Sequence, residues 1–316
     1  MTDFTQIPVL DVSPLIAGQP TAALATAFAK AYGGTGFAYI VGHGIAPALR
    51  AAVFDASRRF HALPETMKQA IALNDIHRGY IAINTSTDVN SDLAEVTRPN
   101  QSASFMAMRE DAQADPATYL SGPNQWPDLP GFRDACEAYV TAMTSLGRAL
   151  MGLALDAIGA TDRTFLNAFD TPTTWLRLLH YPPQSPQAPS DLYGSAPHKD
   201  FGCLTLLAQD DVGGLQVQTP GGAWVDAPPM ADAFIVNVGD MLHRLSNGRL
   251  LSTPHRVINA TGRERYSVPF FFDPHVSASI APLPGTGAPR FAPLNFGDFL
   301  RAVLEAGYDA HKPPAP

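Results

Sequence analysis

The chain has 316 residues and a formal net charge of -8, and it is 46% apolar and only 16% charged. The apolar fraction excludes an intrinsically disordered chain, and the acidic balance argues against a nucleic-acid partner, which requires a basic surface. The 29 prolines argue against an all-helical bundle, because proline interrupts the interior of a helix. The length predicts one or two compact domains.

The N-terminal segment MTDFTQIPVLDVSPL has neither the basic start nor the apolar stretch of a secretory signal. Two cysteines, Cys136 and Cys203, are too few for a disulfide framework. The most apolar stretch, residues 149–159, is too short to span a membrane. We therefore expect a cytoplasmic protein without membrane partners. No heptad pattern indicates a coiled-coil partner, so a monomer is expected.

The first half of the chain mixes helices with short strands. Hydrophobic periodicity and turn residues predict strands over 7–12 and 36–41 and helices over 21–32, from Pro47, from Pro64 and over 132–158. The last of these carries an apolar residue every three or four positions, which is typical of a helix that faces the core. Residues 84–104 are polar without any period and predict a long loop.

The second half is rich in short β-type runs separated by glycine and proline. These runs are TWLRLLHY, CLTLLAQ, GLQVQ, AWVDA, FIVNV, HRVI and YSVPFFF. Regularly spaced short strands of this kind predict a sandwich, a barrel or a jelly roll. A last helix is expected over 295–307, where five apolar residues lie on one face.

A candidate metal site begins the β-rich half. His198 and Asp200 are two residues apart, and positions i and i+2 of a strand project to the same face. His255 lies near the start of another predicted strand. Two histidines and one carboxylate leave open positions on an octahedral ion, as in the facial triad of non-haem Fe(II) oxygenases. The same ligands could hold zinc, so the spacing alone leaves the metal open.

A candidate anion site follows ten residues after His255. Arg265 and Ser267 share one face of a predicted strand, and a guanidinium beside a hydroxyl binds a carboxylate well. An anion site one strand from an open metal predicts a dicarboxylic co-substrate that spans the two. Among the other histidines, His61, His77 and His311 are predicted to lie on the surface.

At these residues the chain resembles the isopenicillin N synthase-like family of 2-oxoglutarate- and iron-dependent oxygenases. The resembling segments are IPVLDVSPL, GFAYIVGHGI, GPNQWPDLPGF, LLHYPPQ, APHKDFGCLTLLAQDDVGGLQVQ, FIVNVGDMLHRLSNGRLLSTPHRV and RERYSVPFFFDP. Together they cover nearly the whole chain.

The resemblance implies a mainly β fold with flanking helices, built on a double-stranded β-helix or jelly-roll core. The expected parts are an N-terminal α/β region over 1–130, a long helix over 131–160, a catalytic core over 174–290 and a C-terminal helix or lid over 291–316. We expect all four parts to form one compact unit.

The resemblance also assigns roles to residues. The two histidines and Asp200 named above would bind Fe(II) and act as the catalytic centre, and Arg265 with Ser267 would bind the distal carboxylate of 2-oxoglutarate. Tyr181 matches a family tyrosine that helps to bind this co-substrate. Many plant members carry an asparagine where this chain has Leu179. Arg177 has the same strand parity as Tyr181 and is expected to reach the co-substrate pocket instead.

The implied activity is that of a dioxygenase that hydroxylates or desaturates a small molecule. The reaction would use O2, pass through a ferryl intermediate and release succinate and CO2, and ascorbate is expected to help in vitro. The substrate is expected to contact residues 84–108, the aromatic end of the last strand and the C-terminal helix. The candidate substrate residues are Arg98, Phe105, Met106, Phe272 and Phe299.

Three alternatives remain open at this point. One is an iron oxidase or cyclase of the same fold that does not use 2-oxoglutarate, since isopenicillin N synthase itself keeps the Arg-x-Ser motif without it. Another is an ethylene-forming enzyme that fragments 2-oxoglutarate. A non-catalytic jelly-roll binding protein is the third.

Overall fold

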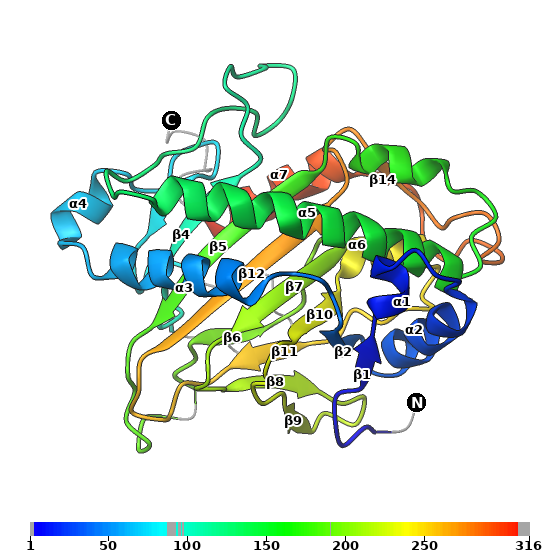
Figure 1. Cartoon of the computed structure of the whole chain (residues 1–316), viewed down its shortest axis with the longest axis horizontal. Helices are drawn as coiled ribbons and strands as arrows, with labels where there is room; N and C mark the ends of the chain where they lie inside the picture. Colours follow the sequence, from blue (N-terminus) through cyan, green and yellow to red (C-terminus); the bar gives the residue numbers. More distant parts are fainter. Residues whose placement is uncertain (1–2, 87–92, 94–95, 97, 190, 309–316) are drawn as a thin grey trace.

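The computed structural model describes residues 3–86, 93, 96, 98–189 and 191–308 of the chain. It consists of two facing β-sheets with helices on the outside (Figure 1). The larger sheet has the strand order β1 (Val9–Asp11), β2 (Phe37–Val41), β10 (Phe234–Val238), β7 (Leu204–Gln209), β12 (Arg265–Asp273), β5 (Thr173–Tyr181), β4 (Ala103–Met108) and β3 (Gly79–Ile81). The smaller sheet has the order β6 (Ser195–His198), β11 (His255–Val257), β8 (Leu215–Gln218) and β9 (Trp224–Asp226).

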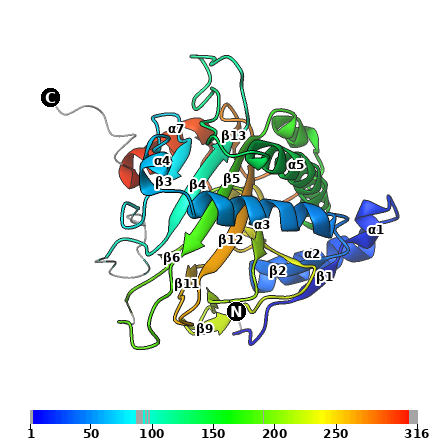
Figure 2. The same cartoon turned by 60° about the vertical axis from the view of Figure 1, so that its left-hand side comes forward.

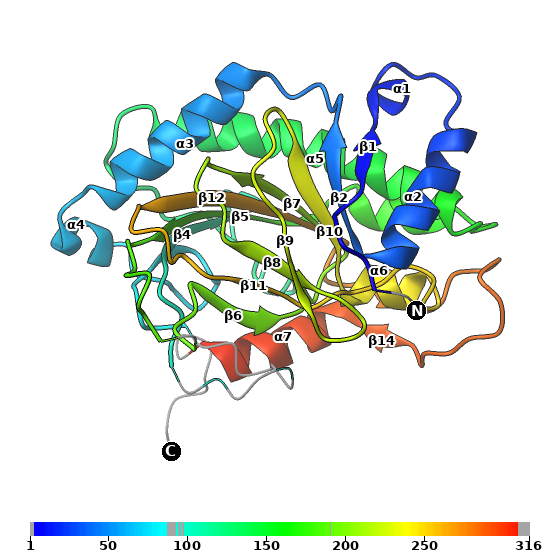
Figure 3. The ribbon, with the colours of Figure 1, turned by 90° about the horizontal axis from the view of Figure 1, so that it is seen from below.

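The helices lie mainly on two sides of this core. They are α1 (Ser13–Ile16), α2 (Ala22–Gly34), α3 (Pro47–His61), α4 (Glu65–Gln69), α5 (Phe132–Ala157), the 3-10 helix η1 (Thr164–Phe169), α6 (Asp240–Leu245) and α7 (Phe296–Gly307). A short ribbon of β13 (Ser279–Ile280) and β14 (Leu294–Asn295) precedes α7. Figure 3 shows α3 and α5 on one side of the larger sheet, and the smaller sheet with α7 on the other side.

This architecture confirms the jelly-roll core with flanking helices. Strands from the second half of the chain form the whole of the smaller sheet and the four central strands of the larger one. The pairings between named strands are antiparallel except that of β1 with β2. The polar loop is shorter than expected, because its last two predicted residues, Ala103 and Ser104, pair with β5 as the start of β4. Pairing with the buried strand β5 thus makes a strand of residues whose own sequence has no hydrophobic periodicity.

The predicted helices form with small changes at their ends. Proline occupies the start of α3, where its missing N–H is not needed for a helical hydrogen bond. Asn295 caps α7, since its side-chain oxygen accepts a 3.0 Å hydrogen bond from the N–H of Asp298. These local signals account for two of the helix starts without reference to the rest of the fold.

The long helix α5 packs against β5, β7 and β12 of the larger sheet (Figure 2). By length and composition alone α5 could cross a membrane, but half of its most apolar stretch is buried inside the protein. Gly147 makes the closest approach to the sheet: an added Cβ would lie 2.7 Å from the ring of Phe272. A glycine at this position therefore allows the helix to lie directly on that ring.

Two histidines expected on the surface are buried. His61 ends α3 facing the sheet, where its Nε2 lies 3.0 Å from the Leu178 carbonyl oxygen. His77 is 1% exposed and has a φ of 61°, and its ring packs edge-on against Trp175 and Tyr308. Both predictions were wrong because a lone histidine carries no pattern that reports which way a helix end or a turn faces. His311 lies outside the described residues.

We predict that Gly147→Ala lowers the free energy of unfolding by about 1–3 kcal/mol, the usual cost of overpacking a core. Gly152 lies on the same helix, where an added Cβ meets only the flexible end of Arg163 at 3.2 Å. Gly152→Ala should therefore be neutral or stabilising by up to about 1 kcal/mol, as expected from helix propensity. Urea unfolding of both variants checks this, and equal effects would contradict the close packing of Gly147.

A second prediction concerns acid stability. Burial, with contributions from His180 and Lys68, lowers the pKa of His61 to about 3, even though the Leu178 carbonyl opposes this shift. The folded state therefore holds neutral His61, and the stability this provides is present above pH 6.5 and lost as the pH falls towards 3. We expect wild type to lose up to about 1.4 kcal/mol per pH unit below about pH 6.5 relative to His61→Gln. Urea unfolding at about pH 7, 6 and 5 measures both slopes, and parallel slopes would contradict the expectation.

Candidate functional site

Three predicted ligands meet at one end of the cleft between the two sheets. His255 at the start of β11 pairs directly with His198 at the end of β6, so both imidazoles come from the smaller sheet. Oδ1 of Asp200 lies 3.6 Å from Nε2 of His198 and 3.7 Å from Nε2 of His255. The ligand atoms of the three residues all lie within 4.8 Å of one another.

Asp200 lies after the end of β6 and not within it, so strand alternation does not orient its carboxylate. Its orientation comes from the larger sheet instead. Oδ2 accepts a 2.7 Å hydrogen bond from Asn237 of β10 and a short one from the hydroxyl of Thr205 of β7. Oδ1 is thereby left towards the two histidines. These contacts fix the direction in which a nearly buried carboxylate points.

The electrostatics favour the charged carboxylate. Burial raises the pKa of Asp200, but the two histidines and its hydrogen-bond donors outweigh this effect and leave the pKa below its usual value. His198 Nδ1 lies 2.7 Å from the Ala196 carbonyl oxygen, and His255 Nδ1 lies 3.3 Å from that of Thr253. A carbonyl at Nδ1 places the proton on that nitrogen, so that Nε2 carries the lone pair that binds a metal.

The donor set fits a single metal ion. Metal–nitrogen and metal–oxygen bonds of about 2.1 Å allow two ligand atoms of one ion to be up to about 4.2 Å apart, and both measured separations are shorter. Two imidazoles and one carboxylate on one side of the ion leave its other positions open. The open positions would face the cavity, since His198 and Asp200 both line it.

The predicted anion site lies on β12 and the adjoining β5. Arg265 is wholly buried and pairs in register with Tyr181, with its guanidinium 4.5 Å from the tyrosine ring centre. The guanidinium donates to the Gly213 carbonyl at 2.5 Å, to Ser267 at 3.3 Å and to the Gln209 side chain at 3.0 Å.

No carboxylate of the described residues forms an ion pair with Arg265. Because a buried charge without a counter-charge is costly, this guanidinium is a candidate to bind an anion. The structure thus brings Arg265, Ser267 and Tyr181 together, as the sequence predicted.

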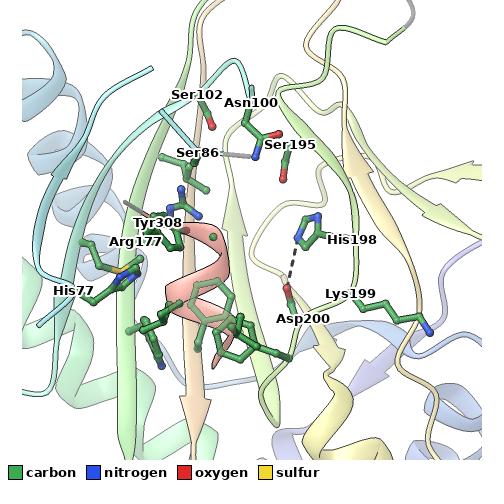
Figure 4. A pocket seen from close by; sticks show the side chains of 18 of the residues that line it. His77, Ser86, Asn100, Ser102, Arg177, Ser195, His198, Lys199, Asp200 and Tyr308 are labelled. Atoms are coloured by element: carbon green, nitrogen blue, oxygen red, sulfur yellow. Dashed lines mark ion pairs between the residues drawn. The ribbon is translucent and has the colours of Figure 1, made fainter. Parts of the chain in front are cut away.

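A cavity of about 530 Å³ opens beside the metal-binding candidates. Its polar side is shown in Figure 4, in which Arg177 and His198 lie on opposite sides of the cavity. Alternate residues of β5 line the cavity in the order Trp175, Arg177, Leu179 and Tyr181. The strand therefore runs along the cavity from its aromatic end to the end beside the anion site.

The structure places some of the five predicted substrate residues at the cavity and the others elsewhere. Met106 and Phe299 line the cavity. Phe105 and Phe272 do not: Phe105 packs on Phe60 and Phe132 under the outer helices, and Phe272 stacks on Phe169. Strand alternation explains the correction, because Met106 and Phe271 face the cavity and their neighbours in sequence face the helices.

Arg98 is corrected for a different reason. It is half-exposed and forms an ion pair with Asp191, 3.5 Å away, and it is not among the residues that line the cavity. Ser86, Asn100, Ser102 and Phe271 also line the cavity, and they lie in the segments that the sequence analysis expected to contact the substrate. Sequence reasoning missed His77, Trp175 and Phe201, which line it as well. The parity of Trp175 with Tyr181 on β5 was a sequence signal that could have found Trp175.

Comparison with known proteins agrees with this geometry. Residues 172–274 match the 2OG-Fe(II) oxygenase superfamily model, and residues 7–129 match the model of the N-terminal region of non-haem dioxygenases in morphine synthesis. A 2-oxoglutarate-Fe(II) type oxidoreductase of Emericella nidulans is 35% identical, with 96% of this chain and 91% of the relative covered. A homoarginine-6-hydroxylase of Glycine max is 34% identical, with 89% of each chain covered.

Solved structures agree as well. A full-length Neurospora crassa protein in complex with alpha-KG superimposes with a TM-score of 0.83 at 30% identity, covering 97% of this chain and 98% of that one. JOX2 in complex with 2OG, Fe and JA superimposes with a TM-score of 0.79 at 27% identity, covering 95% and 85%. By these similarities, the chain belongs to the 2OG-Fe(II) oxygenase superfamily and is a 2-oxoglutarate- and iron-dependent dioxygenase.

Proposed function

We propose that His198, Asp200 and His255 bind the Fe(II) of this dioxygenase, and that Arg265 binds the distal carboxylate of 2-oxoglutarate with Ser267. The observation that carries the proposal is the placement of two Nε2 atoms within 3.7 Å of one Asp200 oxygen, at the edge of a cavity that Tyr181 also lines. When bound, the iron and its co-substrate supply the oxidising chemistry, and the protein supplies orientation and exclusion of water.

The chain's own residues have distinct tasks in this proposal. Asn237 and Thr205 hold the Asp200 carboxylate towards the metal site. Arg265 and Ser267 hold one end of the co-substrate, while Tyr181 packs against the guanidinium. The aromatic and aliphatic side chains of the cavity hold a small-molecule substrate away from water, so that one of its C–H bonds is hydroxylated or desaturated.

The similar proteins support this assignment without naming the substrate. They include a homoarginine-6-hydroxylase and proteins solved in complex with alpha-KG and thymine or with 2OG, Fe and JA. These compounds are chemically diverse, so none of them is transferred to this chain. The co-substrate is common to the named complexes, and the anion site here offers the residues to bind it.

We predict that the Fe(II)-loaded protein without oxygen develops a weak visible charge-transfer band when 2-oxoglutarate is added. His255→Ala should lose the band because iron binding fails, and Arg265→Met should require at least about tenfold more 2-oxoglutarate, as expected for loss of a charged hydrogen-bond donor. Arg263→Met is the matched control, since Arg263 is exposed and paired with Asp211 at 2.9 Å. Anaerobic absorption titrations measure all four proteins.

An absent band in wild type would contradict the proposed co-substrate and would favour an oxidase that does not use it. Succinate release that is accompanied by ethylene in the headspace would instead indicate fragmentation of 2-oxoglutarate. An intact band without release of succinate from 2-oxoglutarate in the presence of any member of a metabolite library would favour a binding protein.

A further prediction concerns the support of Asp200. Asn237→Ala removes the 2.7 Å hydrogen bond to Oδ2, and loss of such a contact usually weakens metal binding about 10- to 100-fold. Asn124→Ala is the control. Asn124 forms hydrogen bonds with the backbone of Met108 and is far in sequence from the three candidate metal ligands. Anaerobic Fe(II) titration gives both affinities. Equal Fe(II) affinity in the two variants would contradict the role of Asn237.

A further inference from the structure

We propose that Arg177 is a substrate-specificity residue that binds the carboxylate of a small organic acid, whose apolar or cyclic body lies against the aromatic end of the cavity. This inference rests on the proposed function and specifies its substrate class. It also revises the expectation that Arg177 serves the co-substrate.

The side chain of Arg177 is held away from the co-substrate site. Its Nε donates a 2.9 Å hydrogen bond to the Ser104 hydroxyl of β4. In the larger sheet β4 and β12 lie on opposite sides of β5, so this bond draws the guanidinium away from Arg265. Neighbouring strands are about 4.8 Å apart, which separates β4 from β12 by about 10 Å.

The positions along β5 separate the two residues as well, although Ser104 pairs with Leu179 and its hydrogen bond draws the Arg177 side chain part of the way along the strand. Arg177 and Tyr181 are four residues apart on one strand face, which corresponds to about 13 Å, with Leu179 between them. The co-substrate anion is expected beside Tyr181, next to Arg265. Arg177 therefore lies farther along the cavity, between the co-substrate end and Trp175.

The guanidinium of Arg177 has unused donors. Among the described residues its only hydrogen bond is the one from Nε to Ser104, and no carboxylate forms an ion pair with it. Arg177 is only partly buried and lines the cavity, so the remaining N–H groups are available to a ligand there. A guanidinium with two free nitrogen atoms matches a carboxylate in shape and charge.

Charge balance also calls for an anion. Fe(II) and Arg265 together would carry three positive charges, and Asp200 and doubly charged 2-oxoglutarate would carry three negative charges. The assembled centre is thus neutral and leaves Arg177 uncompensated. Lys199 and Asp240 also line the cavity, and their charges are opposite in sign. A substrate with one carboxylate completes the balance.

The surroundings of Arg177 define the rest of the ligand. Beyond it on β5, Trp175 packs edge-on against His77 and Phe201, with ring centres 5.1 and 5.8 Å apart. Helix α7 adds Phe299, Val303 and Leu304 to the same cavity. An apolar or cyclic body fits these side chains. The 530 Å³ must also hold the co-substrate, which restricts the substrate to a small molecule.

The test compares acids with their uncharged amides on protein loaded with Fe(II) and 2-oxoglutarate without oxygen. The probes are phenylacetate, 3-phenylpropionate and cyclohexanecarboxylate, each with its primary amide, and binding is measured by calorimetry. We expect at least one acid to bind wild type at least about tenfold more tightly than its amide, as a charge-assisted pair does. Arg177→Met should lose this preference, and Arg177→Lys should retain part of it.

Two controls separate this inference from the proposed function. Arg177→Met should keep the affinity for 2-oxoglutarate within about threefold by the visible band, whereas Arg265→Met should weaken it at least about tenfold. Arg98→Met removes an exposed arginine paired with Asp191 and should keep both the band and the acid preference. Succinate release in air with the bound acid then reports whether its binding leads to turnover.

Several outcomes would overturn the inference. These are equal binding of acids and amides by wild type, binding of none of the acids, an unchanged acid preference in Arg177→Met, and loss of 2-oxoglutarate binding in that variant. All of them leave the wild-type band intact, and with it the proposed function. A missing wild-type band would contradict the proposed function itself.

Discussion

The carboxylate of Asp200 joins the two sheets of the core, and the site depends on this connection. One oxygen accepts hydrogen bonds from Thr205 and Asn237 of the larger sheet, and the other faces His198 and His255 of the smaller sheet. A buried carboxylate is costly unless it is hydrogen-bonded and paired. Both sheets must therefore be correctly placed before Asp200 is satisfied, which couples the fold to the metal site.

Two arginines of β12 and β5 differ in how many of their guanidinium donors already have a hydrogen-bond partner in the protein. Arg265 is fully buried, and its guanidinium is positioned by a carbonyl, a hydroxyl and an amide. None of these partners carries a charge, and the proposed co-substrate carboxylate would supply the counter-charge. Arg177 makes a single hydrogen bond among the described residues, to Ser104, and its remaining donors face the cavity. The same chemical group thus serves two expected anions because neighbouring strands orient it differently.

Strand alternation explains which sequence predictions succeeded. Arg265 and Ser267 were placed on one face because both lie within β12, and the structure confirms this arrangement. The same rule explains why Phe105 and Phe272, expected in the substrate pocket, face the outer helices instead of the cavity. Strand alternation, which was expected to orient Asp200 towards the metal site, does not do so. It lies beyond β6, and contacts to the larger sheet orient it.

The amino-acid sequence by itself determined the family, the jelly-roll class and the residue types of the metal and anion sites, because these depend on short patterns with regular spacing. Only the tertiary structure decided that His61 and His77 are buried, that Arg177 is held on the β4 side, and that Trp175 and α7 close the far end of the cavity. The direction of a side chain at a helix end or in a turn is set by packing between segments distant in sequence. No local pattern reports such packing, and for this reason the substrate-binding part of the site was the part that the sequence described least.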